Sequence, residues 1–321
     1  MFKVIYNGEI EAKAHKDVFG NTLAELAAED KDVVYLDADL MNSSGTYKFW
    51  KENPTRAINC GISEANMMGV AAGLSAMGKK PFAHTFGPFA SRRCFDQVFL
   101  SIAYAKNNVR IYGSDAGVTA AFNGGTHMPF EDMALMRAIP HATVIDVADG
   151  VELAAVLKQS KDREGLTYIR STRKNNYQIY DPSSEFEIGK GNIIRDGKDA
   201  TIIACGIMVG ESMKAADMLA EKGLDVRVVD MFTVKPVDAE LVKKCAEETG
   251  AIVTAENHNI VGGLGDAVSA VLLEECPVPL KKVGVNDEFG QVGPQDYLQE
   301  VYGLTAENVA KTVEEIIASK G

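Results

Sequence analysis

The sequence of 321 residues lacks several features that define whole classes of protein. No apolar run approaches the ~20 residues that a membrane-spanning helix needs, and the N-terminus has no long apolar segment, so we expect a cytoplasmic protein. Basic residues are scarce: 33 Lys and Arg stand against 45 Asp and Glu, a formal net charge of −12. Such a charge repels nucleic acid and anionic membranes, so neither is an expected partner.

Cysteine and histidine are also few, with five of each, and they lack the spacings of known site types. The cysteines are odd in number and never closely paired, so reduced thiols in the core explain them best. There is no Cys-x-x-Cys and no His-x-x-x-His, so we predict no metal ligands in this chain. A phosphorylated ligand would need a local basic pocket.

What the first half of the chain does have is an alternation of buried-strand and amphipathic-helix patterns. This alternation predicts a parallel sheet covered on both faces. The predicted strands are 33–39, 56–60, 81–86, 109–113, 143–147 and 167–170, and the predicted helices are 18–28, 90–105, 131–138 and 151–158.

A polar stretch at residues 175–191 interrupts this pattern, and we place a domain boundary there, between domains 1–185 and 186–321. Asp196-Gly197 predicts a hairpin turn that leads into a second α/β series. The expected fold is therefore α/β, with two Rossmann-like parallel-sheet lobes. The second series has predicted strands at 200–206, 226–231, 252–256 and 280–285, and predicted helices at 210–222, 238–249, 266–275 and 306–319.

One acid begins an apolar helix in the first domain. After Glu64 the next charge is Lys79, so Ser63 is predicted as the N-cap and Gly78 as the C-terminal stop. Burial would favour the neutral, protonated form of Glu64, which could donate a hydrogen bond to a ring nitrogen. The helix alone leaves a second interpretation open, in which Glu64 is a solvated acid stabilised by the helix dipole.

Several motifs together resemble a known family. The chain is similar to the pyrimidine-binding domain of transketolase at Gly-Ile-Ser-Glu-Ala-Asn-Met-Met-Gly (61–69), Thr-Phe-Gly-Pro-Phe (85–89), Gly-Gly-Thr-His-Met-Pro-Phe-Glu-Asp (124–132) and Ile-Arg-Ser-Thr-Arg (169–173). Met-Phe-Thr-Val-Lys-Pro-Val-Asp (231–238) and Asn-Asp-Glu-Phe-Gly (286–290) resemble its C-terminal domain. The Gly-Asp-Gly segment with which transketolases bind magnesium and diphosphate is missing. The resemblance therefore implies the C-terminal subunit of a split transketolase.

Such a subunit would hold thiamine diphosphate together with an N-terminal transketolase subunit, which would supply most of the magnesium site. The resemblance implies that the chain is inactive alone and that a second copy of it completes a heterotetramer. The reaction would transfer a two-carbon ketol unit from a ketose to an aldose, as in the pentose phosphate pathway.

The same resemblance assigns cofactor and catalytic roles. Glu64 would hydrogen-bond the aminopyrimidine ring, and Phe89 would stack on it, while Phe86 belongs either to the cofactor site or to the core. His127 would contact substrate hydroxyls and move protons. Asp39 corresponds to an acid near the thiazolium ring and the dimer interface.

The substrate residues implied by the resemblance are less uniform. Ser43 and Arg173 agree with the family pattern. Lys16 keeps the charge of a family arginine but loses its bidentate fork. Asp115 replaces a histidine, and Asn123 replaces the usual aspartate. These departures leave room for a modified or differently phosphorylated ketose. The alternative for Lys16 and Asp115 is solvated surface charge.

Two other functions remain open. The beta subunit of a 2-oxo-acid dehydrogenase decarboxylating component has similar length and a Phe-Asp-Gln like residues 95–97, but Gly-Gly-Thr-His at 124–127 favours transketolase. A non-catalytic regulatory paralogue is the other alternative. The presence of Glu64, Phe89 and His127 speaks against it.

Overall fold

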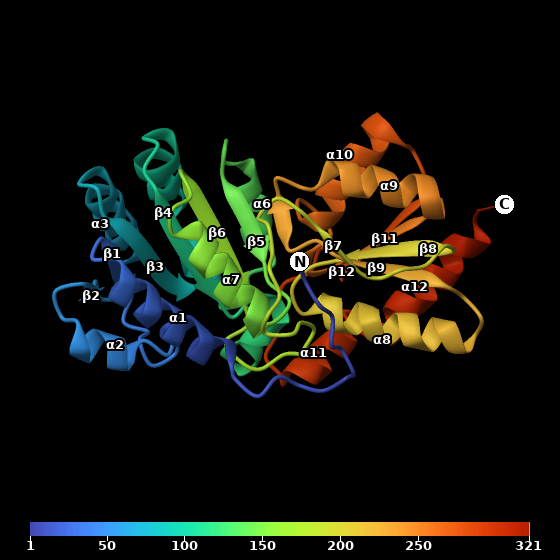
Figure 1. Cartoon of the computed structure of the whole chain (residues 1–321), viewed down its shortest axis with the longest axis horizontal. Helices are drawn as coiled ribbons and strands as arrows, with labels where there is room; N and C mark the ends of the chain where they lie inside the picture. Colours follow the sequence, from blue (N-terminus) through green and yellow to red (C-terminus); the bar gives the residue numbers. More distant parts are fainter. Residues whose placement is uncertain (321) are drawn as a thin grey trace.

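The computed structural model describes residues 1–320, which form two α/β lobes that lie side by side (Figure 1). The first lobe contains a seven-stranded sheet in the order β10-β5-β6-β4-β3-β1-β2, and the second a five-stranded sheet in the order β12-β11-β8-β9-β7. The predicted fold class is confirmed. The strands are β1 (Val33–Asp37), β2 (Ala57–Asn59), β3 (Lys80–Phe86), β4 (Val109–Ser114), β5 (Thr143–Asp146), β6 (Leu166–Ser171), β7 (Asn192–Arg195), β8 (Ala200–Ala204), β9 (Val226–Asp230), β10 (Thr233–Lys235), β11 (Ile252–Asn259) and β12 (Leu280–Val285).

Helices cover the sheets, and in the first lobe α1 and α7 pack against each other in front of the strands (Figure 1). No helix within residues 1–320 is both long and apolar enough to cross a bilayer. The helices are α1 (His15–Glu29), α2 (Tyr47–Glu52), α3 (Glu64–Ala76), α4 (Gly87–Ala90), η1 (Arg92–Cys94), α5 (Phe95–Gln97), η2 (Val98–Tyr104), η3 (Gly117–Asn123), α6 (Asp132–Ala138), α7 (Gly150–Ser160), α8 (Met208–Glu221), α9 (Ala239–Thr249), α10 (Leu264–Glu275), α11 (Gln295–Val301) and α12 (Ala306–Ala318).

The central strands of the first lobe are continuous runs of buried residues, as expected for parallel strands covered on both faces. β1 pairs in parallel with β2 and β3, β3 with β4, and β4 with β6. Their carboxyl ends therefore meet at one edge of the sheet. The segments that follow these strands carry every residue that the sequence nominated for the site except Phe86, the last residue of β3, and Lys16, which lies near the start of α1.

The single helix predicted at 90–105 is wrong. The structure breaks this region into α4, the 3₁₀-helix η1, the short α5 and the π-helix η2. Ser91 leaves the helical region, with φ −108° and ψ −90°, and its hydroxyl donates to the Gly87 carbonyl oxygen at 2.8 Å. The Cys94 thiol similarly donates to the Phe89 carbonyl oxygen at 3.1 Å. Irregular helices of this kind are often found beside functional sites.

The hairpin predicted at Asp196-Gly197 is also wrong, because β7 pairs antiparallel with β9 instead of β8. β8 is already flanked in parallel by β9 and β11, so β7 takes the free edge of β9. The sequence also missed α2, α11 and β10, all of which are short. β10 comes from the second half of the chain yet pairs antiparallel with β5, which ties the second lobe to the first sheet.

A buried ion cluster also ties the lobes together. Arg170 is fully buried, and its Nε and Nη1 lie 2.9 Å from carboxylate oxygens of Asp132 and Asp146. Its Nη2 donates to the Asn257 carbonyl oxygen of the second lobe at 3.1 Å. Burial alone would lower the pKa of Arg170, but the two carboxylates raise it instead. Asp132, the first residue of α6, is a buried partner of this arginine because the second lobe covers the start of α6.

Candidate active site

Glu64 is the first residue of α3 and is only 3% exposed, which confirms the predicted burial and excludes the solvated alternative. It follows β2, so it reaches the edge where the strands end. The Thr85 hydroxyl donates to its Oε1 at 3.4 Å. The predicted Ser63 cap is wrong in detail: within the described chain, the Ser63 side chain makes no capping hydrogen bond, although its backbone occupies the N-cap position.

The surroundings of Glu64 differ from the sequence prediction in one respect. The Arg93 guanidinium donates from Nη1 to Glu64 Oε1 at 3.0 Å. The carboxyl is thus ion-paired, not enclosed by apolar groups alone. Arg93 reaches it because the break after α4 turns the chain, and η1 then carries the arginine back toward the start of α3.

Aromatic rings lie next to this ion pair. The Phe89 and His127 ring centroids are 5.0 Å apart with an interplanar angle of 75°, and Phe86 lies 5.8 Å from His127. The Arg93 guanidinium carbon is 3.8 Å from the centroid of the Phe89 ring. Phe89 is half-buried, whereas Phe86 is a buried residue that is only 7% exposed. Glu64, Phe89 and His127 therefore belong to one connected cluster.

His127 lies on the loop that follows η3, and the Thr126 hydroxyl is 2.9 Å from its Nδ1. Burial, followed by the charges of Arg93, Arg92 and Arg173, lowers the pKa of His127 below 6.5. The imidazole is therefore neutral at neutral pH, and it has a nitrogen that can accept a proton.

A second cluster lies at the other end of the site. Arg173, after β6, places Nε 3.0 Å from Asp115 Oδ1 and Nη1 3.5 Å from Ser43 Oγ. The Lys16 backbone N–H donates to the Arg173 carbonyl oxygen at 3.2 Å. The Arg173 guanidinium lies 5.6 Å from the Phe86 ring, which links this cluster to the aromatic one. The structure thus brings Ser43, Asp115 and the backbone of Lys16, all nominated as substrate residues, together around Arg173.

Asp115 is fully buried, so surface charge does not account for it. Burial raises its pKa to about 6, against the opposing charges of Arg173, His84 and Lys174. The Ser114 hydroxyl, 3.5 Å from Asp115 Oδ2, is 3.0 Å from His84 Nε2, whose Nδ1 is 2.9 Å from Asp37. These buried polar groups, linked by hydrogen bonds, hold Asp115 in place beside Arg173.

Two predicted residues do not join these clusters among the described residues. Asp39 is exposed and accepts a hydrogen bond from Asn59 at 2.8 Å. Asn123 is half-buried at the end of η3. Asp39 has φ +66°, Asp115 has φ +62° and Ala121, two residues before Asn123, has φ +48°, so uncommon backbone conformations gather at this edge. The cofactor role of Asp39 and the substrate role of Asn123 stay predictions.

Sequence reasoning missed Arg93 and His84. Arg93 belongs to the Arg-Arg pair that follows the nominated Phe89. The sequence shows these two charges, but it does not show that η1 turns back and places Arg93 next to Glu64. His84 lies inside the buried strand β3, where a histidine resembles any other core residue.

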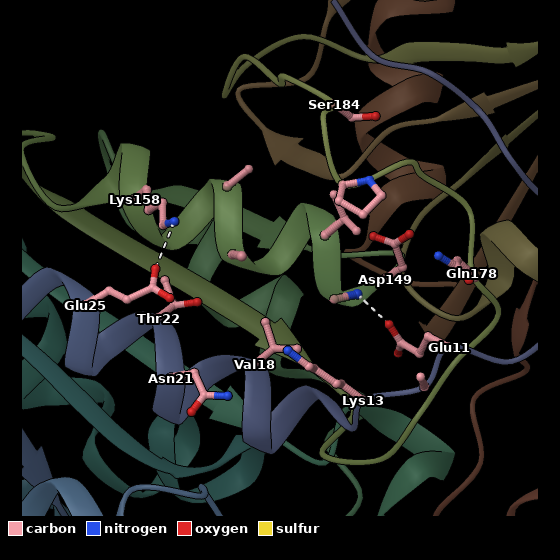
Figure 2. Close-up of a pocket in the computed structure, with 16 residues that line it drawn as sticks. Glu11, Lys13, Val18, Asn21, Thr22, Glu25, Asp149, Lys158, Gln178 and Ser184 are labelled. Carbon is pink, nitrogen blue, oxygen red and sulfur yellow. Dashed lines mark hydrogen bonds and ion pairs between the residues drawn. The ribbon is translucent and has the colours of Figure 1, made fainter.

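A cavity of about 550 Å³ lies elsewhere, between α1 and α7 (Figure 2). None of the nominated site residues lines it. Its acids are already occupied: Glu11 accepts from the backbone N–H groups of Gly150 and Asn176, and Asp149 accepts from three others. Glu25 and Lys158 form an ion pair of 3.0 Å across its rim. Size alone does not make this cavity the candidate site.

Comparison with known proteins identifies the family. Residues 11–178 match the transketolase pyrimidine-binding domain, and residues 189–309 match the transketolase C-terminal domain. The chain belongs to the transketolase family. The 6-deoxy-6-sulfo-D-fructose transketolase subunit of Clostridium sp. (strain MSTE9) is 48% identical over 97% of this chain and 98% of its own length. An apulose-4-phosphate transketolase subunit of Phocaeicola vulgatus is 38% identical over 93% of this chain and 96% of its own length.

Among solved structures, a split-gene transketolase described as an inactive β4 tetramer matches with a TM-score of 0.89 and 44% identity, over 97% of this chain and 100% of that one. The predicted likeness to the C-terminal subunit of a split transketolase is therefore confirmed. The domain boundary at 185/186 stays a prediction.

The transketolase family implies thiamine diphosphate, and the residues present fit its pyrimidine ring. A flat guanidinium already lies against Phe89 while it donates to Glu64. A flat aminopyrimidine needs the same two contacts, one face on an aromatic ring and one edge on a carboxyl group. The surroundings of Phe89 and Glu64 therefore accommodate a planar, nitrogen-rich group.

Proposed function

We propose that this chain is the catalytic C-terminal subunit of a split, thiamine-diphosphate-dependent transketolase. It transfers a two-carbon ketol unit from a ketose donor to an aldose acceptor, together with an N-terminal subunit that holds the diphosphate and most of the magnesium site. We place the enzyme in carbohydrate metabolism of the cytoplasm. The observation that carries the proposal is the buried Glu64 beside Phe89, with His127 in the same cluster.

Each residue has a task that its geometry supports. Phe89 presents a half-buried ring on which the pyrimidine would stack, and Glu64 would hold the edge of the pyrimidine by a hydrogen bond. When bound, thiamine diphosphate supplies the electron sink for cleavage next to the donor carbonyl. His127, a neutral imidazole next to Phe89, takes and returns the proton of a substrate hydroxyl. One cluster thus combines ring recognition with proton transfer.

The charged cluster indicates the class of donor. Lys16 and Arg173 are cations, and Asp115 cancels one of them at 3.0 Å, so these three residues leave one net positive charge. A phosphate ester carries about −1.5 to −2 near neutral pH, whereas a sulfonate carries a single negative charge. This balance favours a ketose with a singly charged substituent, and a relative at 48% identity is named for 6-deoxy-6-sulfo-D-fructose. We therefore propose a sulfonated ketose as the donor.

A phosphorylated ketose is the second candidate. A relative at 38% identity is named for apulose 4-phosphate. Arg92, whose Nη1 lies 2.8 Å from Glu131, could supply a further cation if that ion pair opens. The two candidates differ in the charge of the donor, so direct competition between such donors distinguishes them.

Dependence on a partner has two supports. The chain resembles subunits of split enzymes along nearly their whole length, and a similar structure of this subunit type is described as an inactive β4 tetramer. A second copy of this chain in a heterotetramer follows from the family pattern in which cofactor sites lie between units.

The test is reconstitution with the N-terminal subunit, expected to be encoded beside this chain. The pair is supplied with thiamine diphosphate and magnesium, and each candidate ketose is offered with an aldose acceptor. We expect transfer by the pair, none by this chain alone, and faster transfer from the sulfonated donor. Transfer by the single chain would contradict partner dependence. Absence of transfer by a cofactor-loaded pair with every donor would contradict the proposed reaction.

A further inference from the structure

Arg93 makes two contacts that belong to different parts of the candidate site. Its guanidinium carbon lies 3.8 Å from the centroid of the Phe89 ring, and its Nη1 lies 3.0 Å from Glu64 Oε1. The planar guanidinium of Arg93 therefore covers a face of the Phe89 ring and donates a hydrogen bond to the buried Glu64 carboxyl at the same time. Among the described residues, no other side chain both hydrogen-bonds Glu64 and makes a ring or cation contact with Phe89.

We infer that Arg93 is a built-in occupant of the pyrimidine position, which closes the cofactor site in the separate subunit and has to swing out before the cofactor ring can bind. This inference rests on the proposed function, because it takes Glu64 and Phe89 as the ring-binding pair. A guanidinium is planar, carries several N–H donors and stacks on aromatic faces, so it imitates an aminopyrimidine edge.

The surroundings of Arg93 allow it to move. Its side chain is 45% exposed, so it can leave into water without a large desolvation cost, whereas Glu64 is 3% exposed and stays. Arg93 lies on the three-residue η1, between the break at Ser91 and the short α5, and not within a long rigid helix. Its removal leaves the Thr85 hydroxyl as the polar side-chain contact of Glu64 among the described residues.

Because Arg93 has to leave before the cofactor ring binds, the affinity of the separate subunit for the cofactor is lowered by a predictable factor. A ligand that needs a minor conformation binds more weakly in proportion to the population of that conformation. If Arg93 is out of the site for roughly a tenth of the time, the apparent dissociation constant rises about tenfold. The separate subunit then binds the cofactor weakly. Assembly with the partner raises this affinity by holding Arg93 outside the site.

The experiment compares Arg93→Ala with Arg92→Ala, a matched control. The Arg92 side chain is also 45% exposed and pairs with a glutamate, Glu131, at 2.8 Å. Binding of thiamine and of thiamine diphosphate is titrated calorimetrically with the separate subunit and with the reconstituted pair, and circular dichroism checks the folding of each variant. We expect Arg93→Ala to tighten binding about tenfold in the separate subunit, and Arg92→Ala to leave it unchanged.

Unchanged or weaker binding by folded Arg93→Ala in the separate subunit overturns the inference. So does a crystal structure of the cofactor-loaded pair in which Arg93 still stacks on Phe89. If Arg93→Ala misfolds, Arg93→Gln, which keeps most of the side-chain length without the charge, gives the same comparison. A wild-type pair that binds no thiamine diphosphate defeats the proposed function itself. A wild-type pair that binds cofactor, together with a separate subunit whose cofactor binding Arg93→Ala does not tighten, defeats this inference alone.

Discussion

Replacement of Asp115 by asparagine should stabilise the protein, and the gain should grow as the pH rises. Asp115 is fully buried, and burial raises its pKa from 3.8 to about 6 although Arg173 lies 3.0 Å away. Asparagine has nearly the same shape and tolerates the positive φ of +62° at this position. Arg173 is 26% exposed, so water can solvate it when its partner loses the charge.

The direction of the pH dependence of stability follows from the pKa of Asp115 in the folded and in the unfolded chain. The folded-state pKa lies above the unfolded one, so as the pH rises the unfolded chain releases its proton first. The stability linked to that proton is full below pH 3.8 and is lost as the pH rises past about 6. At 1.36 kcal/mol for each tenfold change in proton affinity, the loss above pH 7 is about 3 kcal/mol. At pH 5 it is about half of that value, because only the unfolded chain is then largely ionised.

Urea denaturation at pH 5 and pH 8 measures this difference as the free energy of unfolding. Asp39→Asn is the matched control, because Asp39 follows β1 of the same sheet with φ +66° but is exposed. We expect Asp115→Asn to gain about 1.5 kcal/mol more at pH 8 than at pH 5, and Asp39→Asn to show no such trend. A gain independent of pH, or a loss at pH 8, would refute the reasoning.

Three further predictions follow from the fold and the site. Arg170→Met should lower the free energy of unfolding by about 3–5 kcal/mol in urea, because it leaves two buried carboxylates unpaired; a loss below about 1 kcal/mol would contradict the stabilising role of this ion cluster. Gly117→Ala should destabilise more than Gly223→Ala in thermal denaturation. Both glycines have positive φ, but an added Cβ at Gly117 would lie 2.1 Å from Asn257 Oδ1, whereas Gly223 has nothing within 4 Å; equal losses would exclude the steric effect. In the reconstituted pair, the acid limb of the pH–rate profile should fall below pH 6.5, because burial and neighbouring arginines lower the pKa of His127. His127→Asn should remove that limb, and a limb that persists would assign it to another group.

The sequence predicted the parts of the fold that hydrophobic periodicity governs. Long buried strands such as β4 and β6 and amphipathic helices such as α8 were found close to their observed bounds, because their apolar patterns repeat over many residues. The region after Phe89 was not, since side-chain hydrogen bonds from Ser91 and Cys94 to backbone carbonyls break a pattern that looks helical.

The sequence predicted individual residues of the site but not the ion pairs and hydrogen bonds between them. Motifs nominated Glu64, Arg173 and Asp115, and strand ends that meet at one edge explain why they converge. Ion pairs that depend on tertiary folding, such as Asp115 with Arg173, leave no periodic signal in the chain. For the same reason the partner of Glu64, Arg93, became visible only with the fold.

The most direct test of the account is the rate of ketol transfer by the reconstituted pair when Glu64 is replaced by glutamine. Glu64→Gln replaces the carboxyl group by an amide but keeps the size of the side chain, so the fold and thiamine diphosphate binding should persist while transfer falls by about 10²–10⁴-fold. A near-normal rate in a folded, cofactor-loaded Glu64→Gln pair would contradict the central claim that the reaction needs the carboxyl group of Glu64 at the cofactor ring.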